Sequence, residues 1–167
     1  MTTTTQQETK IGASKDVPTI TITREFDAPR ELVWRAMTEP DLVARWMGPR
    51  DVKMEITQWD LRRGGSWAYT ARRADGSEDD FATGFFGSFH DLRAPERAVQ
   101  TFTWEGEPDG VALETLTLEE LPDGRTRMVT TSVVDSFETR DMILASGMES
   151  GVVQGYEKLD ALLATGL

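Results

Sequence analysis

The sequence lacks cysteine, has a single histidine and contains no long apolar run. Without cysteine among its 167 residues, the chain can form no disulfide, thiolate metal site or thiol nucleophile. His90 alone cannot build a multi-histidine metal site, and we expect no metal and no organic cofactor. No apolar segment approaches the roughly 20 residues of a transmembrane helix. Residues 1–16 also lack the apolar stretch of a signal peptide, so we expect a cytoplasmic protein.

Positive charge is scarce as well. Lysine and arginine number 18 against 29 aspartates and glutamates, which gives a formal net charge of -11. Such a chain repels the phosphates of nucleic acids and anionic membrane surfaces, and we expect neither as a partner. Five tryptophans and seven phenylalanines indicate a globular core instead. We expect a small-molecule partner, and a homodimer is possible.

The order of the apolar patterns predicts an α+β fold. Residues 17–26 alternate as a strand does, and two short amphipathic helices are expected over residues 27–37 and 40–48. Six further strands follow with short turns between them, and a long final helix is expected from Glu138 to Ala164. Consecutive strands with short turns favour one antiparallel sheet, whose apolar face the long helix must cover. Residues 17–167 then form one domain, and residues 1–16 a polar, mobile tail.

Strand alternation also predicts which side chains face the interior. Met54 and Ile56 lie on the apolar face of the strand at residues 52–59. The same reasoning predicts that aromatic side chains of three later strands line one contiguous interior. These are Trp67, Tyr69, Phe86, Phe102 and Trp104.

Three glycines recur every fourth residue in the expected final helix, at Gly147, Gly151 and Gly155. Each costs roughly 1 kcal/mol of helix stability relative to alanine. They lie on or beside the face that carries Leu144 and Met148. Either they allow close backbone packing, or they leave an internal cavity for a ligand. We expect a cavity at Gly155 and close packing at the other two.

Several segments together resemble a known family. They are "FDAPRELVWRAMTEPDLVARWMGP", "DLRRGGSWAY", "APERAVQTFTW", "LETLTLEE", "GRTRM" and "SGMESGVVQGYEKLDALL". They are similar to the homologues of the activator of the heat-shock protein 90 ATPase, in the SRPBCC superfamily of START-related domains and polyketide cyclases. The resemblance implies the helix-grip fold, a curved antiparallel sheet wrapped around a long C-terminal helix. It also implies a deep cavity for an apolar or amphipathic molecule.

We therefore expect a ligand site between the sheet and the final helix. Its expected residues are Trp46, Met54, Ile56, Trp67, Tyr69, Phe86, Phe102, Trp104, Met148, Val152, Gly155 and Tyr156. The chain departs from the family in one respect. Relatives often carry a glutamate where "GFFGS" ends in Ser88. A further N-terminal domain of the eukaryotic co-chaperones has no counterpart here beyond the polar tail, which weakens the expectation of a chaperone role.

Two residues are candidates for catalysis, Glu114 and Tyr69. Strand parity points Glu114 inward, where an aromatic cavity would raise its pKa toward values useful in acid–base chemistry. The alternative is that Glu114 lies at the wet end of its strand and is merely solvated. Tyr69 could orient a ligand through its hydroxyl, or it could simply pack in the core.

The sequence thus favours binding of a small, largely apolar or amphipathic molecule in an internal cavity. Two alternatives stay open. One is a polyketide-cyclase-like or hydrolytic enzyme that uses Glu114 and Tyr69. The other is a co-chaperone-like protein-interaction module. An inward, dry Glu114 with a polar neighbour would favour the enzyme, and a large apolar patch on the outer face of the sheet would favour the interaction module.

Overall fold

A computed structural model describes residues 7–77 and 82–167, and its main feature is an eight-stranded antiparallel sheet with the order β1-β2-β8-β7-β6-β5-β4-β3. The strands are β1 (Lys10–Ala13), β2 (Thr19–Phe26), β3 (Val52–Trp59), β4 (Ser66–Arg73), β5 (Ala82–Arg93), β6 (Arg97–Trp104), β7 (Ala112–Glu120) and β8 (Thr126–Val133). The helices are α1 (Arg30–Thr38), α2 (Pro40–Trp46), the 3-10 turn η1 (Pro122–Gly124), α3 (Phe137–Ala145) and α4 (Met148–Leu163).

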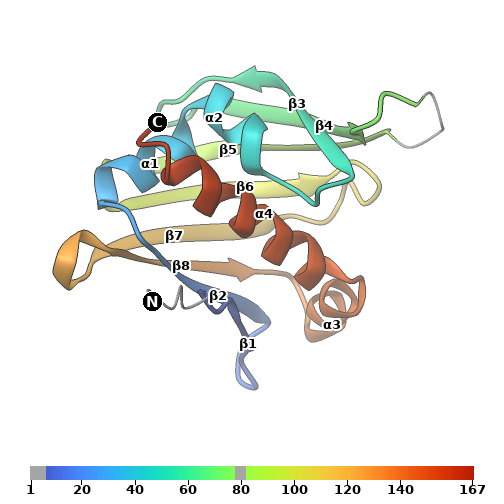
Figure 1. Cartoon of the computed structure of the whole chain (residues 1–167). Helices are drawn as coiled ribbons and strands as arrows, with labels where there is room; N and C mark the ends of the chain where they lie inside the picture. The colour runs from blue at the N-terminus through green and yellow to red at the C-terminus, as the bar shows by residue number, and fades with distance from the viewer. Residues whose placement is uncertain (1–6, 78–81) are drawn as a thin grey trace.

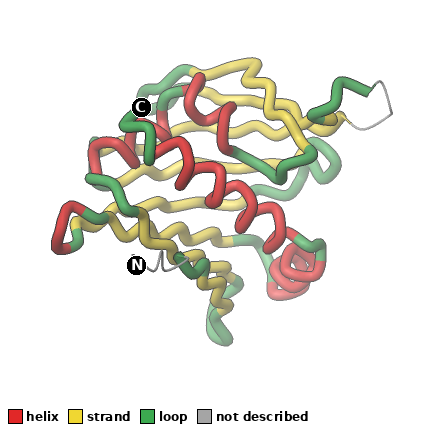
Figure 2. Tube along the Cα trace, viewed as in Figure 1, coloured by secondary structure: helices red, strands yellow, loops and turns green. Residues whose placement is uncertain are grey.

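The helices α1, α2 and α4 lie on one face of the sheet, and α4 runs across its strands (Figure 1). The tube in Figure 2 shows the same layers, with the helical layer in front of the curved strands. This arrangement confirms the predicted α+β helix-grip architecture, in which the sheet wraps around a long C-terminal helix and two short helices follow the first long strand.

One part of the core lies where the second half of α4 packs on β2, β7 and β8. Leu159 is fully buried there, together with Phe26 and Met128. Beside them the buried Arg24 donates two hydrogen bonds to the carboxylate of Asp160, at 2.8 and 2.5 Å. This ion pair ties β2 to α4, so both apolar packing and charge hold the end of the helix on the sheet.

A second part of the core belongs to β3, β4 and β5. Its fully or nearly buried members are Met54, Trp67, Tyr69, Ala71 and Phe89. Their aromatic rings contact one another: the rings of Trp67 and Tyr69 stack with centroids 5.2 Å apart. This cluster therefore gains part of its packing from contacts within the sheet, and it depends less on side chains of α4.

Folded structure begins earlier than the sequence predicts. Residues 10–13 form the edge strand β1, which pairs with β2 from Lys10 opposite Thr23 to Ala13 opposite Ile20. The expected tail boundary at residue 16 is therefore wrong for this segment. Its short sequence KIGA has too few residues for an alternating pattern to stand out. Residues 1–6 of the expected tail lie outside the described residues.

The expected helix from Glu138 to Ala164 is two helices. α3 ends at Ala145, α4 begins at Met148, and Gly147 between them has a φ of +86°. This left-handed conformation is costly for residues with a side chain and interrupts the helix. Leu144 therefore belongs to α3 and not to a continuous apolar face with Met148.

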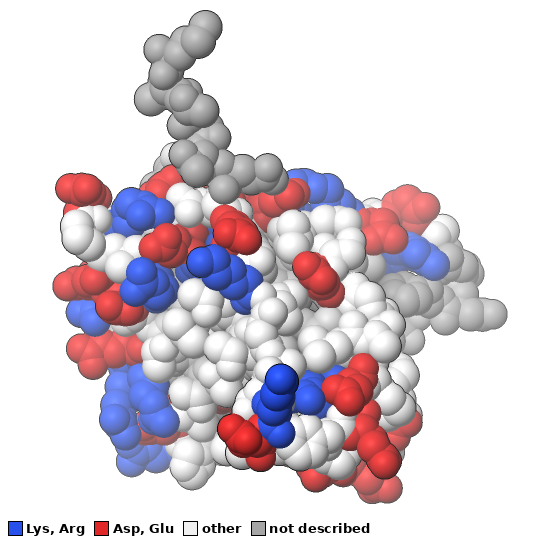
Figure 3. All heavy atoms as spheres, turned by 90° about the horizontal axis from the view of Figure 1, so that it is seen from below, with Lys and Arg blue, Asp and Glu red and all other residues white. Residues whose placement is uncertain are grey.

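Ion pairs link neighbouring strands on the surface. Arg127 of β8 contacts Glu119 of β7 at 3.2 Å and Glu25 of β2 at 3.5 Å. Seen from below, acidic and basic side chains are interspersed toward the sides of the molecule, with a broad uncharged area between them (Figure 3). On the face seen in that view, the acidic residues thus surround an uncharged area and do not merge into one patch.

Candidate functional site

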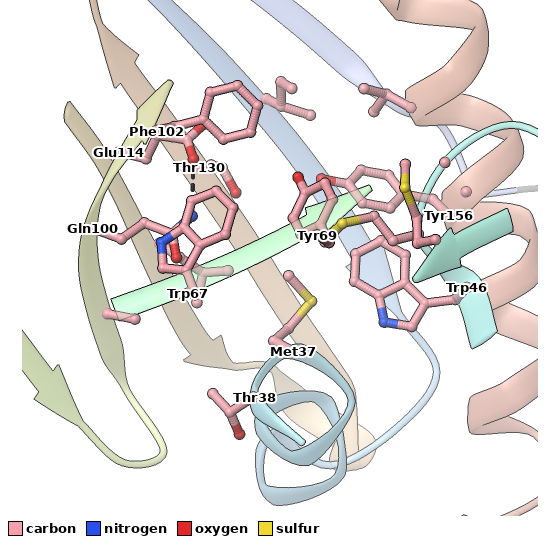
Figure 4. A pocket seen from close by; sticks show the side chains of 18 of the residues that line it. Met37, Thr38, Trp46, Trp67, Tyr69, Gln100, Phe102, Glu114, Thr130 and Tyr156 are labelled. Atoms are coloured by element: carbon pink, nitrogen blue, oxygen red, sulfur yellow. Dashed lines mark hydrogen bonds between the residues drawn. The ribbon is translucent and has the colours of Figure 1, made fainter. Parts of the chain in front are cut away.

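A cavity of about 360 Å³ lies between the concave face of the sheet and the first half of α4. Its wall is formed by seven strands and three helices (Figure 4). The volume falls at the lower end of the roughly 300–1,000 Å³ typical of small-molecule sites. The lining residues are Ile22, Met37, Thr38, Trp46, Met47, Gly48, Met54, Trp59, Trp67, Tyr69, Phe89, Leu92, Ala98, Gln100, Phe102, Glu114, Leu116, Thr130, Met148, Gly151, Val152, Gly155 and Tyr156.

Aromatic side chains of the sheet make up much of the wall. The ring of Trp67 stacks on Tyr69 and lies 5.7 Å from that of Phe102, centroid to centroid. Gly87 of β5 makes room for the indole, because a Cβ there would overlap Trp67 and the carbonyl of Thr101. The indole N–H of Trp67 is buried and has no hydrogen-bond partner within residues 7–77 and 82–167. Packing therefore sets the position of this ring.

The last residue of α2, Trp46, and the two residues after it border the cavity on the side of α4. Trp46 donates a hydrogen bond from its indole N–H to the carbonyl of Ala36 at 2.8 Å. Its ring also lies 6.1 Å from that of Tyr156. These two contacts hold Trp46 in the wall, so the residue both fills the core and borders the cavity.

The three glycines of the helical region have three different surroundings. A Cβ on Gly155 would lie 3.4 Å from the carbonyl oxygen of Trp46 and 3.5 Å from the backbone of Gly48, which is contact without overlap, and Gly155 also borders the cavity. Gly151 makes only an ordinary contact, 3.6 Å to Pro49. Gly147 has nothing within 4 Å. The expectation of close packing at Gly147 is therefore wrong. Gly151, for which close packing was also expected, makes only this ordinary contact and borders the cavity, as Gly155 does.

The polar end of the cavity is built around Glu114 of β7. Gln100 of β6 donates from Nε2 to Oε1 of Glu114 at 3.0 Å, and the hydroxyl of Ser132 in β8 lies 3.0 Å from Oε2. Burial raises the pKa of the Glu114 carboxyl above its ordinary value, and the two hydrogen bonds oppose part of that rise. The alternative of a solvated carboxylate at a wet strand end is thus wrong, and the inward orientation is right.

Two tyrosines border the same space. Burial raises the pKa of the Tyr69 hydroxyl above its ordinary value, and the nearby Glu114 raises it further. The same two causes raise the pKa of Tyr156, against a hydrogen bond with Thr130 that lowers it. Both phenols therefore stay neutral throughout the physiological range and can act only as hydrogen-bonding groups.

Nine of the twelve expected ligand-binding residues border the cavity: Trp46, Met54, Trp67, Tyr69, Phe102, Met148, Val152, Gly155 and Tyr156. Phe86 does not, because it is 41% exposed on the outer face and Phe85 takes the inward position opposite Tyr69. Trp104 is 45% exposed near the end of β6, where its indole donates to Thr83.

Ile56 is the third residue that the structure places elsewhere. It borders a separate hollow between α2 and β3, together with Pro40 and Ala44. A register shift between Ile56 and Gln58 interrupts the pairing of β3 with β4 just after this position. Ile56, Phe86 and Trp104 therefore do not border the cavity.

Several lining residues were not expected. Met37 and Thr38 come from the end of α1, Phe89 and Leu92 from β5, and Gln100 from β6. Phe89 and Leu92 share the interior despite their odd spacing, because the pairing of β5 with β6 shifts register between Phe89 and Asp91. Simple alternation cannot show such a bulge. The inward orientation of Gln100 follows from the strand parity that it shares with Phe102, although Gln100 is not among the expected ligand-binding residues.

Two other kinds of site were sought among the described residues. No group of three or more histidines, aspartates and glutamates within residues 7–77 and 82–167 is arranged to hold a metal ion. In the same part of the chain, no helix is both long and apolar enough to cross a membrane. His90 is exposed, away from the cavity wall.

The family of the chain follows from comparison with known sequences. A family model described as Activator of Hsp90 ATPase homolog 1-like protein matches residues 27–164. The chain belongs to this family. The match spans every element that lines the cavity except β2, and it confirms the resemblance to SRPBCC-type proteins. A search of curated proteins found no match.

Solved structures with this fold agree with the assignment to the Activator of Hsp90 ATPase homolog 1-like family. A protein from Rhodobacter sphaeroides is 25% identical with a TM-score of 0.81, over 95% of this chain and 99% of that one. A protein from Arthrobacter aurescens is 27% identical with a TM-score of 0.82, over 93% and 91%. A protein from Mycobacterium smegmatis has the same fold, with 24% identity and a TM-score of 0.81 over 95% and 97%.

Proposed function

We propose that the protein binds a small, largely apolar or amphipathic molecule in the cavity between the sheet and α4. The observation that carries the proposal is the cavity itself, which is internal, walled mostly by aromatic and aliphatic side chains, and equipped with a few convergent polar groups. Apolar pockets with a small number of placed polar groups are the usual form of small-molecule sites. The SRPBCC-type fold of the family supports the same function.

The most direct test is native mass spectrometry of freshly purified protein, combined with titration by the neutral fluorophore N-phenyl-1-naphthylamine. We expect either a co-purifying small molecule, which denaturation releases, or saturable binding of one fluorophore per chain. Trp46 and Trp67 border the cavity, so quenching of their fluorescence gives an independent signal. Absence of both a bound molecule and saturable binding would refute the proposal.

A second candidate function is an enzyme with Glu114 as its acid or base. The supporting observation is the carboxyl group in the cavity, whose pKa burial raises and whose oxygens Gln100 and Ser132 hold in place. A desolvated carboxylate is a stronger base than one in water. Tyr69 would orient the substrate, because its neutral hydroxyl borders the same space.

The ring opening of 5-nitrobenzisoxazole tests whether such a base is available. A base removes the proton from C3, the N–O bond breaks, and a coloured cyanophenolate forms. The enzyme hypothesis predicts a rate in the wild type that Glu114→Gln abolishes and that Glu119→Gln, on the same strand but exposed, leaves unchanged. Equal rates in all three proteins would contradict it.

A further inference from the structure

We propose that the ligand of this cavity carries a cationic head, a protonated or quaternary amine, which lies against Glu114 while its apolar body fills the aromatic part. This inference rests on the proposed binding function and specifies the chemical class of the ligand. It follows from the charges inside the cavity, the hydrogen bonds of Glu114 and the rings around it.

The cavity contains an acid without a basic partner. Glu114 is the one acidic residue among those that line it, and none of them is lysine, arginine or histidine. Arg24, which also lies on the inner side of the sheet, is already paired with Asp160. A carboxylate in an apolar space is costly unless an opposite charge compensates it. No described residue lining the cavity supplies that charge, and a cationic ligand would.

The hydrogen bonds of Glu114 suit an ionised carboxylate. The amide N–H of Gln100 can only donate, and the hydroxyl of Ser132 can donate to the other oxygen. These donors favour the charged form without neutralising it. Figure 4 shows the carboxylate beside Phe102 and Gln100 at one side of the cavity. Glu114 borders the space inside, so its oxygens are placed to contact a ligand head.

Aromatic rings favour the same charge. The rings of Trp67, Tyr69 and Phe102 form one connected group in the wall. The centroid of the Trp67 ring lies 5.2 Å from that of Tyr69 and 5.7 Å from that of Phe102. The faces of such rings attract ammonium groups, most strongly where water is excluded. An anionic head would meet these faces and Glu114 together and would be repelled by both. The wall therefore discriminates by sign of charge as well as by apolarity.

A neutral ligand with a carbonyl group is the competing possibility. Glu114 would then be protonated and would donate a hydrogen bond to the carbonyl. The two cases differ in pH dependence. Binding of a cation requires the ionised form, so affinity for an amine must rise as pH rises through the pKa of Glu114. The other titratable groups that face Glu114 are Tyr69 and Tyr156, whose raised pKa values keep them neutral in this range.

The experiment uses three probes with one skeleton: 4-phenylbutylamine, 4-phenylbutanol and 4-phenylbutanoate. Affinities of the full-length protein are measured by calorimetry at pH 5 and pH 8. At pH 8 we expect the amine to bind at least about tenfold more tightly than the alcohol, and the carboxylate more weakly than both. The preference for the amine should shrink at pH 5.

Two variants complete the test. Glu114→Gln should remove the preference for the amine while binding of 4-phenylbutanol persists, and Glu119→Gln, which changes the net charge equally at an exposed site, should retain the preference. Circular dichroism confirms that each variant is folded. If the alcohol binds but the amine gains nothing over it, the cationic-head inference is overturned and the proposed function stands. If no probe binds and no fluorophore binds, the proposed function itself fails.

Discussion

The two halves of α4 lie on the same sheet but have different roles. In the second half, Leu159, Leu162 and Leu163 are at most 6% exposed and fill the space to the strands. In the first half, Gly151 and Val152 are only partly buried and border the cavity. The difference shows that one helix can anchor the fold at one end and leave room for a ligand at the other, through the size of its inward side chains.

The sheet contributes to this contrast. Under the first half of α4, the aromatic side chains of β4 and β6 pack on one another, so they do not require a large helical side chain to cover them. Under the second half, Phe26 and Met128 pack directly with Leu159. Stability and the candidate site thus belong to different ends of the same helix.

Truncating one side chain in each half of α4 tests the contrast between the two halves most strongly. Leu159→Ala should lower the free energy of unfolding by about 2–5 kcal/mol, because it opens a void in a fully packed region. Met148→Ala, at the wall of an existing cavity, should cost clearly less, about 1 kcal/mol. Urea denaturation measures both. Equal losses would show that the two halves are packed alike.

Substitutions at Gly155 probe the boundary between the halves. Gly155→Leu should lower the free energy of unfolding by about 1–3 kcal/mol, since a Cβ at this position already contacts the backbone of Trp46 and Gly48 and the further carbon atoms of leucine would be overpacked. Gly155→Ala should be neutral or slightly stabilising, because its Cβ just fits and alanine favours the helix. Thermal denaturation of both variants checks this. A stabilised leucine variant would show that the side chain extends into the cavity and that Gly155 serves to leave this space open.

The break before α4 gives a smaller expected effect. Gly147→Ala should cost about 1–2 kcal/mol, because Gly147 has a φ of +86° and side chains disfavour that conformation. Gly151→Ala is the matched control within the helix; it should gain up to about 1 kcal/mol. Chemical denaturation distinguishes the two. A gain at Gly147 would indicate one continuous helix, as the sequence alone predicts.

The smallest effect concerns pH. The pKa of Glu114 is raised in the folded state from 4.5, so above that pH the unfolded chain loses its proton first. The contribution of Glu114 to folding stability therefore falls as pH rises from about 4.5 toward its folded-state pKa, and then levels off. Glu114→Gln should gain in stability relative to the wild type over that window. Denaturation at several pH values measures this gain, and a constant difference would contradict the raised pKa.

Sequence patterns predict the architecture well because each element has a distinct apolar period. The patterns fail where strand pairing decides which side chain points inward, or where a turn interrupts a helix. The adjacent pair Phe85 and Phe86 cannot be resolved by alternation alone; the pairing of Phe85 with Tyr69 decides which ring points inward. The turn at Gly147 is invisible to helical periodicity, because the apolar spacing continues across it.

Part of the candidate site is predicted correctly because several of its residues lie on strands with regular alternation. Residues on regular strands, such as Trp67 and Phe102, are assigned correctly by parity. Trp104 has the same parity as Phe102 but is the last residue of its strand and is exposed. Strand parity shows which face a side chain is on and does not show how deeply it is buried. The polar group of Glu114, Gln100 and Ser132 joins three strands, so it becomes apparent only once the order of strands in the sheet is known.

The central claim is that the open first half of α4 forms the binding site, and filling it tests the claim most directly. Val152→Trp should weaken binding of N-phenyl-1-naphthylamine at least about tenfold by occupying the cavity. Val133→Trp, on the outer face of β8 at 40% exposure, is the matched control and should bind as the wild type does. The account predicts loss of binding in the first variant alone. Unchanged binding by a folded Val152→Trp protein would contradict it.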